Sequence, residues 1–461
     1  MIKQQNTYTS LKINADTLTP VGIFKRLEGT KKFLLESSFQ HERKGKFSYV
    51  GANPYEEIIG YGTTTTVRNL ETNETSTYEM HVLQYFKEHF PKINADLPLP
   101  FSGGAIGYIG YDAIRPFTNI GAEKENDLEM PDYHFMVYDT IIAYEHRTEA
   151  AHIIALNTNE ETEPEIDRRI QNIERQLKKE MTIEDPTIAP FEFTSTVEKN
   201  ALIDRVNKPK HYIEKGECEQ IVLSQRMVAT ITDDPFSIYR KLRTANPSPY
   251  MFYIDFADYL IIGASPESLV QTTGRTVVTN PIAGTKPRGK NEAEDAMIAY
   301  ELLQDPKEVA EHDMLVQLSK DDLHPICKQG SIQVPVYKDI VKYEHVMHIV
   351  SETHGILKDH LTSFDALVAC LPAGTVSGSP KIRAMQIINE LEDERRGFYA
   401  GGIGYITFNH DINIAIAIRS LIIKDEKAYV QAGAGIVQDS IAENEYMETL
   451  HKAKSLTNLK N

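Results

Sequence analysis

The chain has 461 residues, of which 41 % are hydrophobic, and 49 Lys and Arg against 66 Asp and Glu give a formal net charge of −17. At about 150 residues per domain this length predicts two or three domains, and the apolar fraction excludes a disordered protein. The acidic balance argues against nucleic acid as a partner, because binding a phosphate backbone needs a dense basic surface.

The three cysteines, Cys218, Cys327 and Cys370, are widely separated and form no CxxC pair. This pattern argues against a disulfide framework and a structural zinc site, and it predicts a reducing, cytoplasmic setting. The polar N-terminus lacks the apolar core of a signal peptide, and no apolar stretch approaches the roughly 18 residues that cross a bilayer. We therefore expect no membrane partner.

The first part of the chain, residues 1–156, is predicted to be a domain built mostly of strands. Its β-branched and aromatic runs are separated by turn residues, and one helix is expected over 80–90, ended by Pro91. Residues 157–192 become polar and acidic, with apolar residues at helical spacing over 164–180. We interpret 157–192 as a connector that carries one helix.

The remaining residues, 193–461, are predicted to form a second domain in which strands and helices are mixed. Ser195 and Glu198 form a capping-box pattern that opens a helix, and Pro209 is expected to kink or interrupt that helix because proline cannot donate the backbone hydrogen bond. The elements follow no regular βαβ rhythm, which predicts an α+β fold rather than a doubly wound sheet. Beyond that helix, strands are expected over 220–230, 259–264, 402–424 with a turn at 409–411, and 428–432, and helices over 293–303, 309–318 and beyond 442.

One short segment of the first part of the sequence is similar to a segment of the second. Gly104–Tyr108 reads GAIGY and Gly401–Tyr405 reads GGIGY. The two segments are either hairpin strands at equivalent places in two similar sheets or a chance repetition.

Two Glu-x-x-Glu pairs lie on predicted helices, Glu308 with Glu311 and Glu445 with Glu448. A spacing of three places both carboxylates of a pair on one helix face. Four carboxylates from two helices suit a hard cation such as Mg²⁺, with one direct ligand from each helix and the others acting through water. The alternative is that both pairs belong to solvated helix faces of an acidic chain.

A strand near the C-terminus offers a place for an anionic ligand. Over 412–418 the isoleucines share one face, while the opposite face carries two small alanines followed by Arg419. The alanines would leave space over the strand, in which Arg419 would clamp a carboxylate through two hydrogen bonds. The alternative is that the alanines pack against a helix and Arg419 reaches solvent.

Three further segments have the composition of ligand-binding loops. Residues 372–381 are small and run into a helix whose N-terminus suits an anion, with Ser379 as N-cap and Pro380 as first helical residue. An ordinary helix cap is the alternative. Residues 431–436 end a strand with two glycines, which permit close backbone approach to a ligand, and 281–289 form a similar loop with cations.

These segments together, in this order, resemble the chorismate-utilising enzymes, most closely the members that make anthranilate. The resemblance spans almost the whole chain, and so many long motifs in one order make it specific. It rests on LLES (34–37), NPSPYMFY (246–253), PIAGTKPRG (281–289), DPKEVAEHDMLV (305–316), YEHVMHIVS (343–351), PAGTVSGSPKIRAM (372–385), GFYAGGIGY (397–405), AIAIRS (415–420), QAGAGIV (431–437) and ENEYMETLHKAKSL (443–456).

The resemblance implies an α+β fold of two sheet-based subdomains, with sandwich-like antiparallel sheets and outer helices. It implies a lyase that converts chorismate and ammonia into anthranilate and pyruvate for tryptophan synthesis. Mg²⁺ is the implied cofactor, bound by Glu311 and Glu448 with Glu308 and Glu445 nearby, and it would hold the ring carboxylate. Residues that match the family's chorismate contacts are Gly284, Thr285, Tyr399, Gly433, Ala434, Gly435 and Arg419, the last on the enolpyruvyl carboxylate. Residues that match its catalytic positions are Thr375 and His348 near the departing ring hydroxyl, with His348 as proton donor, and Glu308.

Two positions distinguish relatives within the family. Gln220 stands where similar isochorismate and salicylate synthases carry a lysine that activates water, so ammonia is the expected nucleophile. Ala283 stands where many aminodeoxychorismate synthases carry a nucleophilic lysine, and alanine cannot form a covalent adduct. Departures from the family pattern at Gln317, Lys320 and Asp321 remove no expected metal or substrate group. The alternatives are an aminodeoxychorismate synthase component I of the folate pathway and a non-catalytic paralogue that binds a ligand.

The resemblance also implies a partner subunit and an inhibitor. No cysteine lies in a Gly-x-Cys-x-Gly nucleophile turn, so a separate glutamine amidotransferase subunit is expected to supply ammonia within a heterotetramer. The segments 34–37 and 246–252 resemble the family's site for feedback inhibition by tryptophan; the alternative is an ordinary strand end and a proline-rich turn. The residues expected there are Glu36 on the ligand's ammonium, Ser37 on its polar atoms, and Pro249, Tyr250 and Met251 as a wall for the indole.

Overall fold

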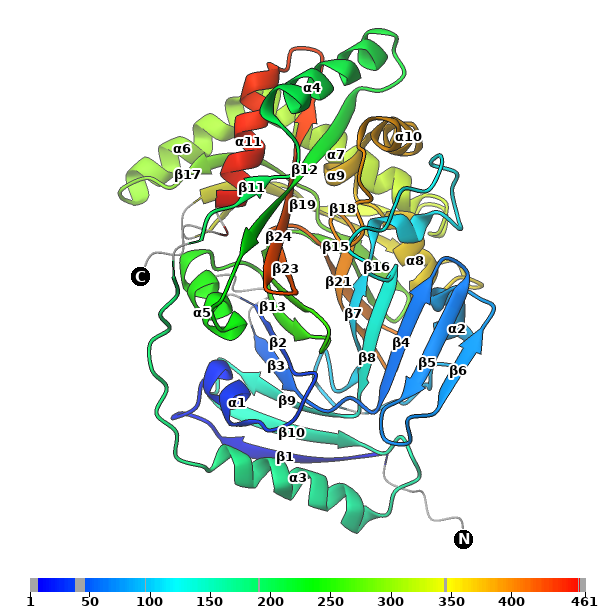
Figure 1. The fold of residues 1–461 in the computed structure, drawn as a ribbon, viewed down its shortest axis with the longest axis vertical. Helices are drawn as coiled ribbons and strands as arrows, with labels where there is room; N and C mark the ends of the chain where they lie inside the picture. The colour runs from blue at the N-terminus through cyan, green and yellow to red at the C-terminus, as the bar shows by residue number, and fades with distance from the viewer. Residues whose placement is uncertain are drawn as a thin grey trace.

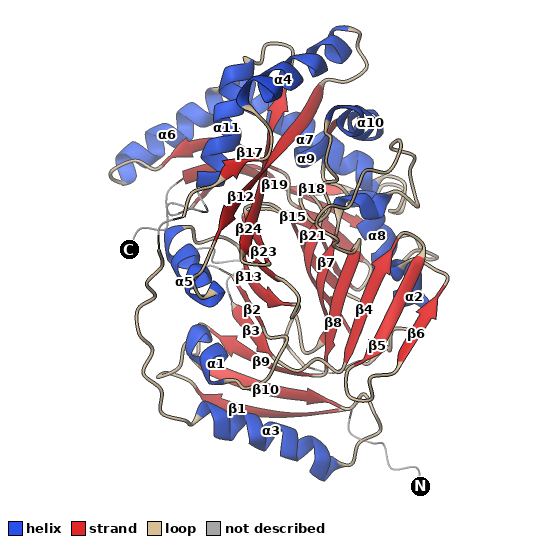
Figure 2. Cartoon of the chain, in the orientation of Figure 1, coloured by secondary structure: helices blue, strands red, loops and turns tan. Residues whose placement is uncertain are grey.

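The computed structural model describes residues 7–37, 46–95, 97–189, 191–343, 346–454 and 456 (Figures 1 and 2). Three residues of the motifs quoted above, Glu344, His345 and Ser455, lie outside the described residues.

Two antiparallel sheets of twelve strands each make up the centre of the molecule. The first sheet runs in the order β1 (Tyr8–Asn14), β10 (Ala150–Leu156), β9 (Thr140–Glu145), β3 (Phe47–Gly51), β2 (Phe33–Glu36), β13 (Tyr250–Asp255), β14 (Leu260–Ser265), β23 (Ser420–Lys424), β24 (Lys427–Ile436), β12 (Gln220–Thr230) and β11 (Thr194–Ser195), with β20 (Gly378–Ser379) on β12. The second runs in the order β17 (Ile282–Pro287), β19 (Val346–Ile356), β16 (Thr276–Thr279), β15 (Ser268–Thr273), β22 (Ile412–Ile416), β21 (Gly402–Thr407), β7 (Gly104–Ile109), β8 (Tyr133–Tyr138), β4 (Glu56–Tyr61), β5 (Thr64–Asn69) and β6 (Thr75–Tyr78), with β18 (Gln333–Lys342) on β19.

Both sheets draw strands from either side of the expected connector. In the first sheet β2 pairs with β13, and in the second β7 pairs with β21. Residues 1–156 and 193–461 therefore do not build one sheet each. The two GxxGY segments lie on β7 and β21, neighbouring strands of the same sheet with Gly107 opposite Gly404, and not at equivalent places in two sheets.

Helices cover the outer faces of the sheets in three groups (Figure 1). Apolar side chains that alternate along the strands fill the space between the sheets on one face and meet these helices on the other. Over the first sheet lie α1 (Pro20–Arg26), α3 (Glu163–Leu177) and α5 (Pro235–Ala245); over the second, α2 (Val82–Glu88) and α8 (Ser363–Cys370). At the end formed by the C-terminal strands lie α4 (Lys199–Glu214), α6 (Glu292–Gln304), α7 (Pro306–Leu323), α9 (Gly374–Ser377), α10 (Lys381–Leu391) and α11 (Ala442–Lys454), and the 3₁₀ helix η1 spans Tyr111–Ile114.

Two local predictions need correction. Pro209 lies inside α4, which continues through it to Glu214, so the proline does not interrupt the helix. Helix α10 begins at Lys381 with Pro380 as its N-cap, one residue later than the sequence predicts. The Ser379 side chain is instead buried on the short strand β20 beside β12.

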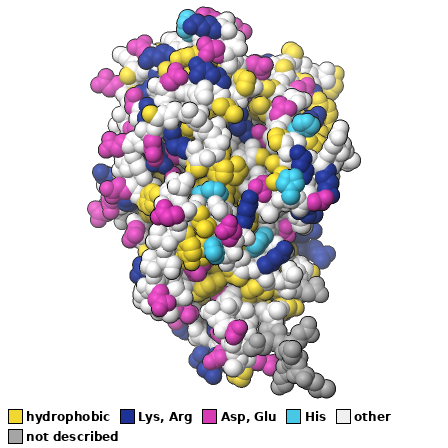
Figure 3. All heavy atoms as spheres, turned by 90° about the vertical axis from the view of Figure 1, so that its right-hand side faces the viewer, with side chains coloured by type: hydrophobic (Ala, Val, Ile, Leu, Met, Phe, Trp, Pro, Cys, Tyr) yellow, Lys and Arg dark blue, Asp and Glu magenta, His cyan; other side chains and the backbone are white. Residues whose placement is uncertain are grey.

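The surface carries charges of both signs. On the face drawn in Figure 3, Lys and Arg side chains are interspersed with Asp and Glu, and no dense basic area is visible there. Within the described residues, none of the helices is long and apolar enough to cross a membrane. All three cysteines are buried and unpaired in the described structure.

Candidate active site

A cavity of about 180 Å³ lies between β12 and β24 of the first sheet and β17 and β19 of the second, with α9 and α11 beside it. It brings together residues that are far apart in the sequence. The predicted site residues on its wall are Ala283, Thr285, His348, Thr375, Tyr399, Arg419 and Gly433. Those outside its lining are Gly284, Ala434, Gly435, Glu308, Glu311, Glu445 and Glu448.

Arg419 is one of the cations on this wall. Its backbone has φ 51, which is uncommon for a residue other than glycine, and its carbonyl accepts a hydrogen bond of 3.0 Å from the Ala264 N–H. Enclosure lowers the pKa of its guanidinium, while Tyr399 and Glu448 act to raise it. A guanidinium that is poorly solvated is strongly stabilised by hydrogen bonds to a carboxylate, so this wall suits an anionic ligand.

The four predicted glutamates form an electrostatic cluster on α7 and α11. The pKa of Glu311 is raised by burial, by Glu308 and by Glu448, and the pKa of Glu445 is raised by burial and by Glu448. Among the described residues, no three His, Cys, Asp or Glu side chains converge on one point as a complete metal site. Carboxylates that raise one another's pKa would be stabilised by a cation, so this donor set fits Mg²⁺ with further ligands from substrate and water.

Lys452 links this cluster to the cavity. Its Nζ lies 2.7 Å from Glu448 Oε1 and donates a hydrogen bond of 2.8 Å to the Gly433 carbonyl. The side chain also lines the cavity, beside Glu267. The sequence reasoning missed this residue, although it lies one helical turn beyond Glu448 on α11.

Two glycines lie where the backbone approaches a functional side chain. Gly284 has φ +67, and a Cβ built there would lie 3.3 Å from Glu308 Oε2. A Cβ at Gly433 would lie 2.7 Å from Tyr399 Oη, closer than real Cβ atoms come. The segment 281–289 is therefore mostly strand β17 and not the expected loop, and Gly284 brings this strand against the carboxylate cluster. Gly433 lets β24 pass Tyr399.

Glu267 is a cavity residue that the sequence reasoning missed. It joins β14 to β15, is only 8 % exposed, and its carbonyl accepts a hydrogen bond of 2.9 Å from the Ile416 N–H. Burial raises the pKa of its carboxyl to about 8, and Thr375 and Lys452 oppose the rise. A carboxyl group that is protonated at neutral pH, on the wall of a cavity, can donate a proton. The sequence signal that could have identified Glu267 is an acidic residue placed directly between two strand-like runs, β14 and β15.

His348 is held in one orientation by backbone. Its Nδ1 lies 2.8 Å from the Gly284 carbonyl oxygen and 3.1 Å from Thr285 Oγ1. Because a carbonyl only accepts, Nδ1 carries the hydrogen and Nε2 is left as an acceptor. Burial lowers the pKa of the imidazole and Arg419 lowers it further, against the Gly284 hydrogen bond. The geometry therefore presents a neutral imidazole with Nε2 as an acceptor, and the expected role of His348 as a proton donor stays a prediction.

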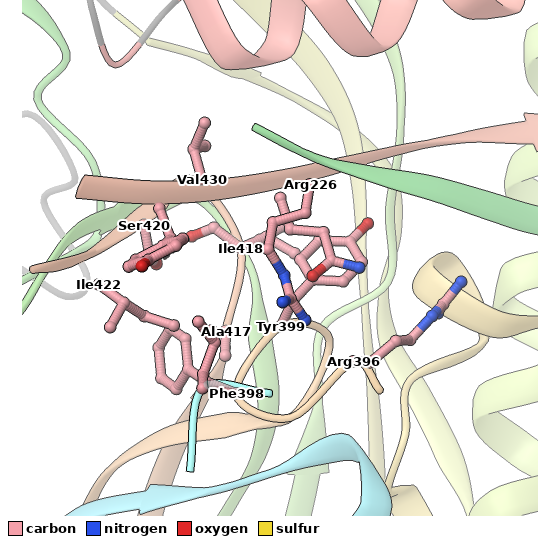
Figure 4. Close-up of a pocket in the computed structure, with 12 residues that line it drawn as sticks. Arg226, Arg396, Phe398, Tyr399, Ala417, Ile418, Ser420, Ile422 and Val430 are labelled. Atoms are coloured by element: carbon pink, nitrogen blue, oxygen red, sulfur yellow. Dashed lines mark hydrogen bonds between the residues drawn. The ribbon is translucent and has the colours of Figure 1, made fainter. Parts of the chain in front are cut away.

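A smaller cavity of about 20 Å³ adjoins the first and shares Tyr399 with it (Figure 4). The Arg396 guanidinium lies 5.5 Å from the centre of the Tyr399 ring. It donates hydrogen bonds of 2.7 Å to the Glu392 carboxylate and to the carbonyls of Val222 and Val376. This buried arginine fixes the ring of Tyr399 at the wall between the two cavities.

A larger cavity, of about 540 Å³, lies between the two sheets and away from the first. The Tyr250 hydroxyl on β13 accepts a hydrogen bond of 2.6 Å from Gln271 Nε2 on β15, so side chains of both sheets meet at the border of this cavity. All five residues expected at the inhibitor site border it. The lining that the sequence reasoning missed includes Ile403, Gly404, Tyr405 and Asn413, on β21 and β22.

Strand geometry divides the five inhibitor-site residues between two faces. Met251 pairs with Glu36 across β13 and β2, so their side chains point to the same side. The Glu36 carboxylate accepts hydrogen bonds from the Tyr239 hydroxyl at 2.6 Å and from Arg243 at 2.7 and 2.8 Å, all on α5. The carboxylate is therefore paired inside the protein, while Glu36 also borders the cavity, and its contact with a ligand's ammonium stays a prediction. Ser37 follows Glu36 and Tyr250 precedes Met251, so we expect the side chains of Ser37 and Tyr250 to point to the opposite side, toward the cavity.

The chain as a whole is similar to known proteins. Residues 30–458 match the chorismate binding enzyme family. The sequence is 43 % identical to anthranilate synthase component 1 of Lactococcus lactis subsp. lactis (strain IL1403), over 96 % of this chain and 98 % of that protein. It is 42 % identical to anthranilate synthase component 1 of Acetivibrio thermocellus, over 97 % of this chain and 94 % of that protein.

The fold is similar to solved structures of the same group. The crystal structure of anthranilate synthase component I from Streptococcus pneumoniae TIGR4 superposes with a TM-score of 0.84 at 40 % identity, covering 97 % of this chain and 99 % of that chain. The menaquinone-specific isochorismate synthase MenF of Escherichia coli shares the fold, with a TM-score of 0.74 at 17 % identity, over 99 % of this chain and 95 % of that chain.

Proposed function

This chain belongs to the chorismate-binding enzyme family, in the branch of anthranilate synthase component 1, and we propose from this membership that it makes anthranilate and pyruvate from chorismate and ammonia with Mg²⁺. The observation that carries the proposal is one cavity whose wall combines Arg419 for an anion, Glu267 as a protonated acid and His348 as a neutral base. The three free, buried cysteines support a cytoplasmic setting.

Binding of a dianion inside an acidic protein requires cations at both carboxylates. Arg419 would take the enolpyruvyl carboxylate through two hydrogen bonds. The side chains of Glu311 and Glu448 would hold Mg²⁺, with Glu308 and Glu445 beside them, and the bound ion would supply positive charge at the ring carboxylate.

The first chemical stage exchanges the ring hydroxyl for nitrogen. The nitrogen lone pair forms a bond to C2, the ring double bonds shift, and the C4–O bond breaks. Glu267 gives its proton to the departing oxygen, which leaves as water. The new C–N nitrogen then carries one extra proton, and its release balances the proton that Glu267 has lost.

The second stage forms the aromatic ring. We assign the removal of the C2 hydrogen to Nε2 of His348, the neutral imidazole of the cavity. The C3–O bond breaks and the enolpyruvyl group takes up a proton as pyruvate. Summed over both stages, the chorismate dianion and NH₃ give the anthranilate and pyruvate anions and water.

Two side chains favour this reaction over those of relatives. Ala283 lines the cavity, so the wall has no amine there to form a covalent adduct. Gln220 lies against Gly435 at the start of β12, and its neutral amide cannot activate water as a lysine would. The direct test is turnover of chorismate with an ammonium salt and Mg²⁺, with the product identified by its fluorescence; 4-amino-4-deoxychorismate as the product would favour the folate-pathway alternative.

We predict that the isolated chain uses ammonia and not glutamine. The rate with ammonium salts should rise with pH, because the fraction of free NH₃ increases. The rise should end where Glu267 loses the proton that the reaction needs. A separate glutamine amidotransferase subunit, within a heterotetramer, is proposed to supply ammonia in the cell. The measurement compares glutamine and ammonium as nitrogen donors for the purified chain. Efficient use of glutamine by the chain alone would contradict the proposal.

We predict feedback inhibition by tryptophan bound in the cavity between the sheets. Ser37 borders that cavity, so the larger side chain of Ser37→Phe should occupy space that tryptophan needs. The tryptophan concentration needed for inhibition should rise by at least about tenfold, which corresponds to about 1.4 kcal/mol of binding free energy. The uninhibited rate should remain close to wild type, because the cavity is separate from the active site. Turnover is measured against tryptophan concentration.

A residue outside the cavity provides a control for this prediction. Ile262→Val changes a buried side chain of β14, in the same sheet but outside the lining of the cavity, and it should leave inhibition nearly intact. A wild-type chain indifferent to millimolar tryptophan would refute the inhibitor site. An active Ser37→Phe chain with unchanged sensitivity would refute the assigned cavity.

A further inference from the structure

A second small cavity, which we call the rear chamber, lies behind Glu267. It has a volume of about 40 Å³ and is bounded by Glu267, Ser268, Thr279, Asn280, Ser319, Asp322, Cys370 and Thr375 together with apolar residues. Glu267 and Thr375 line both the rear chamber and the active-site cavity. These two residues therefore form the partition between the two spaces.

The rear chamber contains polar groups that need a partner. The hydroxyls of Ser268 and Thr279 are buried, at 5 % and 6 % residue exposure, and neither has a hydrogen-bond partner among the described residues. A buried hydroxyl without a partner is unfavourable, and a cavity above about 10–15 Å³ of this kind of volume admits a water molecule. The size of the chamber and its hydroxyls both fit ordered water.

A charged pair adjoins the rear chamber. The carboxylate of Asp322 on α7 lies 2.6 Å from Lys381 Nζ, and the two side chains are 18 % and 14 % exposed. Ser319, one turn earlier on α7, donates to the Val316 carbonyl and shares a hydrogen bond of 2.7 Å with Thr353. Asp322 therefore touches both solvent and the chamber, and its partner Lys381 carries exchangeable protons.

We propose that the rear chamber holds ordered water on Ser268 and Thr279 and returns a proton to Glu267 after each turnover. This inference rests on the proposed role of Glu267 as the acid that protonates the leaving hydroxyl. Once that proton has left with the C4 oxygen as water, Glu267 is a buried carboxylate, and products fill the cavity in front of it. A proton that enters by Asp322 and the chamber water restores the O–H bond of Glu267. The proton released by the new C–N nitrogen to solvent keeps the overall balance at zero.

The test removes one hydroxyl at a time without changing side-chain shape. Thr279→Val and Ser268→Ala should each lower kcat by about tenfold, within the range of a proton-transfer contribution. The value of kcat/KM for chorismate, and the rate of a single first turnover, should stay near wild type, because the resident proton of Glu267 serves that turnover. The assay uses the purified chain with ammonium and Mg²⁺, in rapid mixing and in steady state.

A buried threonine far from the chamber offers a control. Thr65 on β5 is fully buried, donates a hydrogen bond of 2.6 Å to the Met80 carbonyl and does not border the chamber. Thr65→Val should lower the thermal midpoint and leave the ratio of kcat to the first-turnover rate unchanged. A crystal structure of the wild-type chain should show ordered water bonded to Ser268 Oγ and Thr279 Oγ1.

Three outcomes would overturn the inference. The first is a crystal structure without ordered water in the chamber, which would count even if both variants failed to fold. The second is a normal kcat in the chamber variants. The third is an equal loss in kcat and in the first-turnover rate. Failure of the proposed function is distinguishable, because in that case Glu267→Gln itself would retain activity. If Glu267→Gln is inactive while the chamber variants are normal, the acid role stands and the relay fails.

Discussion

Replacing Glu311 or Glu448 by Gln is expected to abolish chorismate turnover with any nitrogen donor. The substitution keeps the shape of the side chain and removes the negative charge that would bind Mg²⁺ directly. Removal of supporting groups around a metal typically costs 10–100-fold in metal affinity, so loss of a direct ligand should cost more than about 100-fold. The expected order of effects is Glu311 and Glu448 first, then Glu308 and Glu445.

The measurements are Mg²⁺ affinity by calorimetry and turnover across Mg²⁺ concentration. Chelation of the metal from the wild-type chain should give the same loss, reversed by added Mg²⁺. A matched control lies on the same helix: Glu443 is exposed and paired with Lys199, so Glu443→Gln should retain activity. Near-normal rates for Glu311→Gln or Glu448→Gln at saturating Mg²⁺ would exclude the assigned ligands.

The motifs predicted part of the wall of the candidate site, because each is a continuous run whose position in the fold follows from its own strand or helix. Thr285, His348, Tyr399 and Arg419 all reach one cavity. The antiparallel α+β class was likewise predictable from alternating apolar runs without a βαβ rhythm. The way both sheets combine strands from both ends of the chain was not, since long-range pairing such as β2 with β13 leaves no local signal.

The orientation of single side chains was not predictable. Adjacent residues on a strand point to opposite faces, so the LLES motif alone does not show which of Glu36 and Ser37 turns toward the cavity that both border. Burial was equally hidden at Glu267, whose raised pKa depends on surrounding strands and helices rather than on its neighbours in sequence.

Glu267→Gln is expected to lower kcat by roughly 10²–10⁴-fold, the usual contribution of a general acid. Glutamine is close in size and keeps hydrogen bonding, but it cannot give a proton to the C4 oxygen. Chorismate binding should change little, because Arg419 and the metal site are untouched. Equilibrium binding and steady-state rates, measured on the same preparations, separate the two effects.

The pH dependence gives this assignment an independent check. The pKa of Glu267 is raised to about 8, so the acid form that the reaction needs is present below that pH and is lost as the pH rises through it. At a fixed concentration of free NH₃, kcat of the wild-type chain should therefore fall above about pH 8, and the low residual rate of Glu267→Gln should lack that fall. Glu56, on β4 and away from the cavity, also has a pKa raised by burial, to about 7. Glu56→Gln should keep the wild-type profile, and if it removed the fall instead, the acid would not be Glu267.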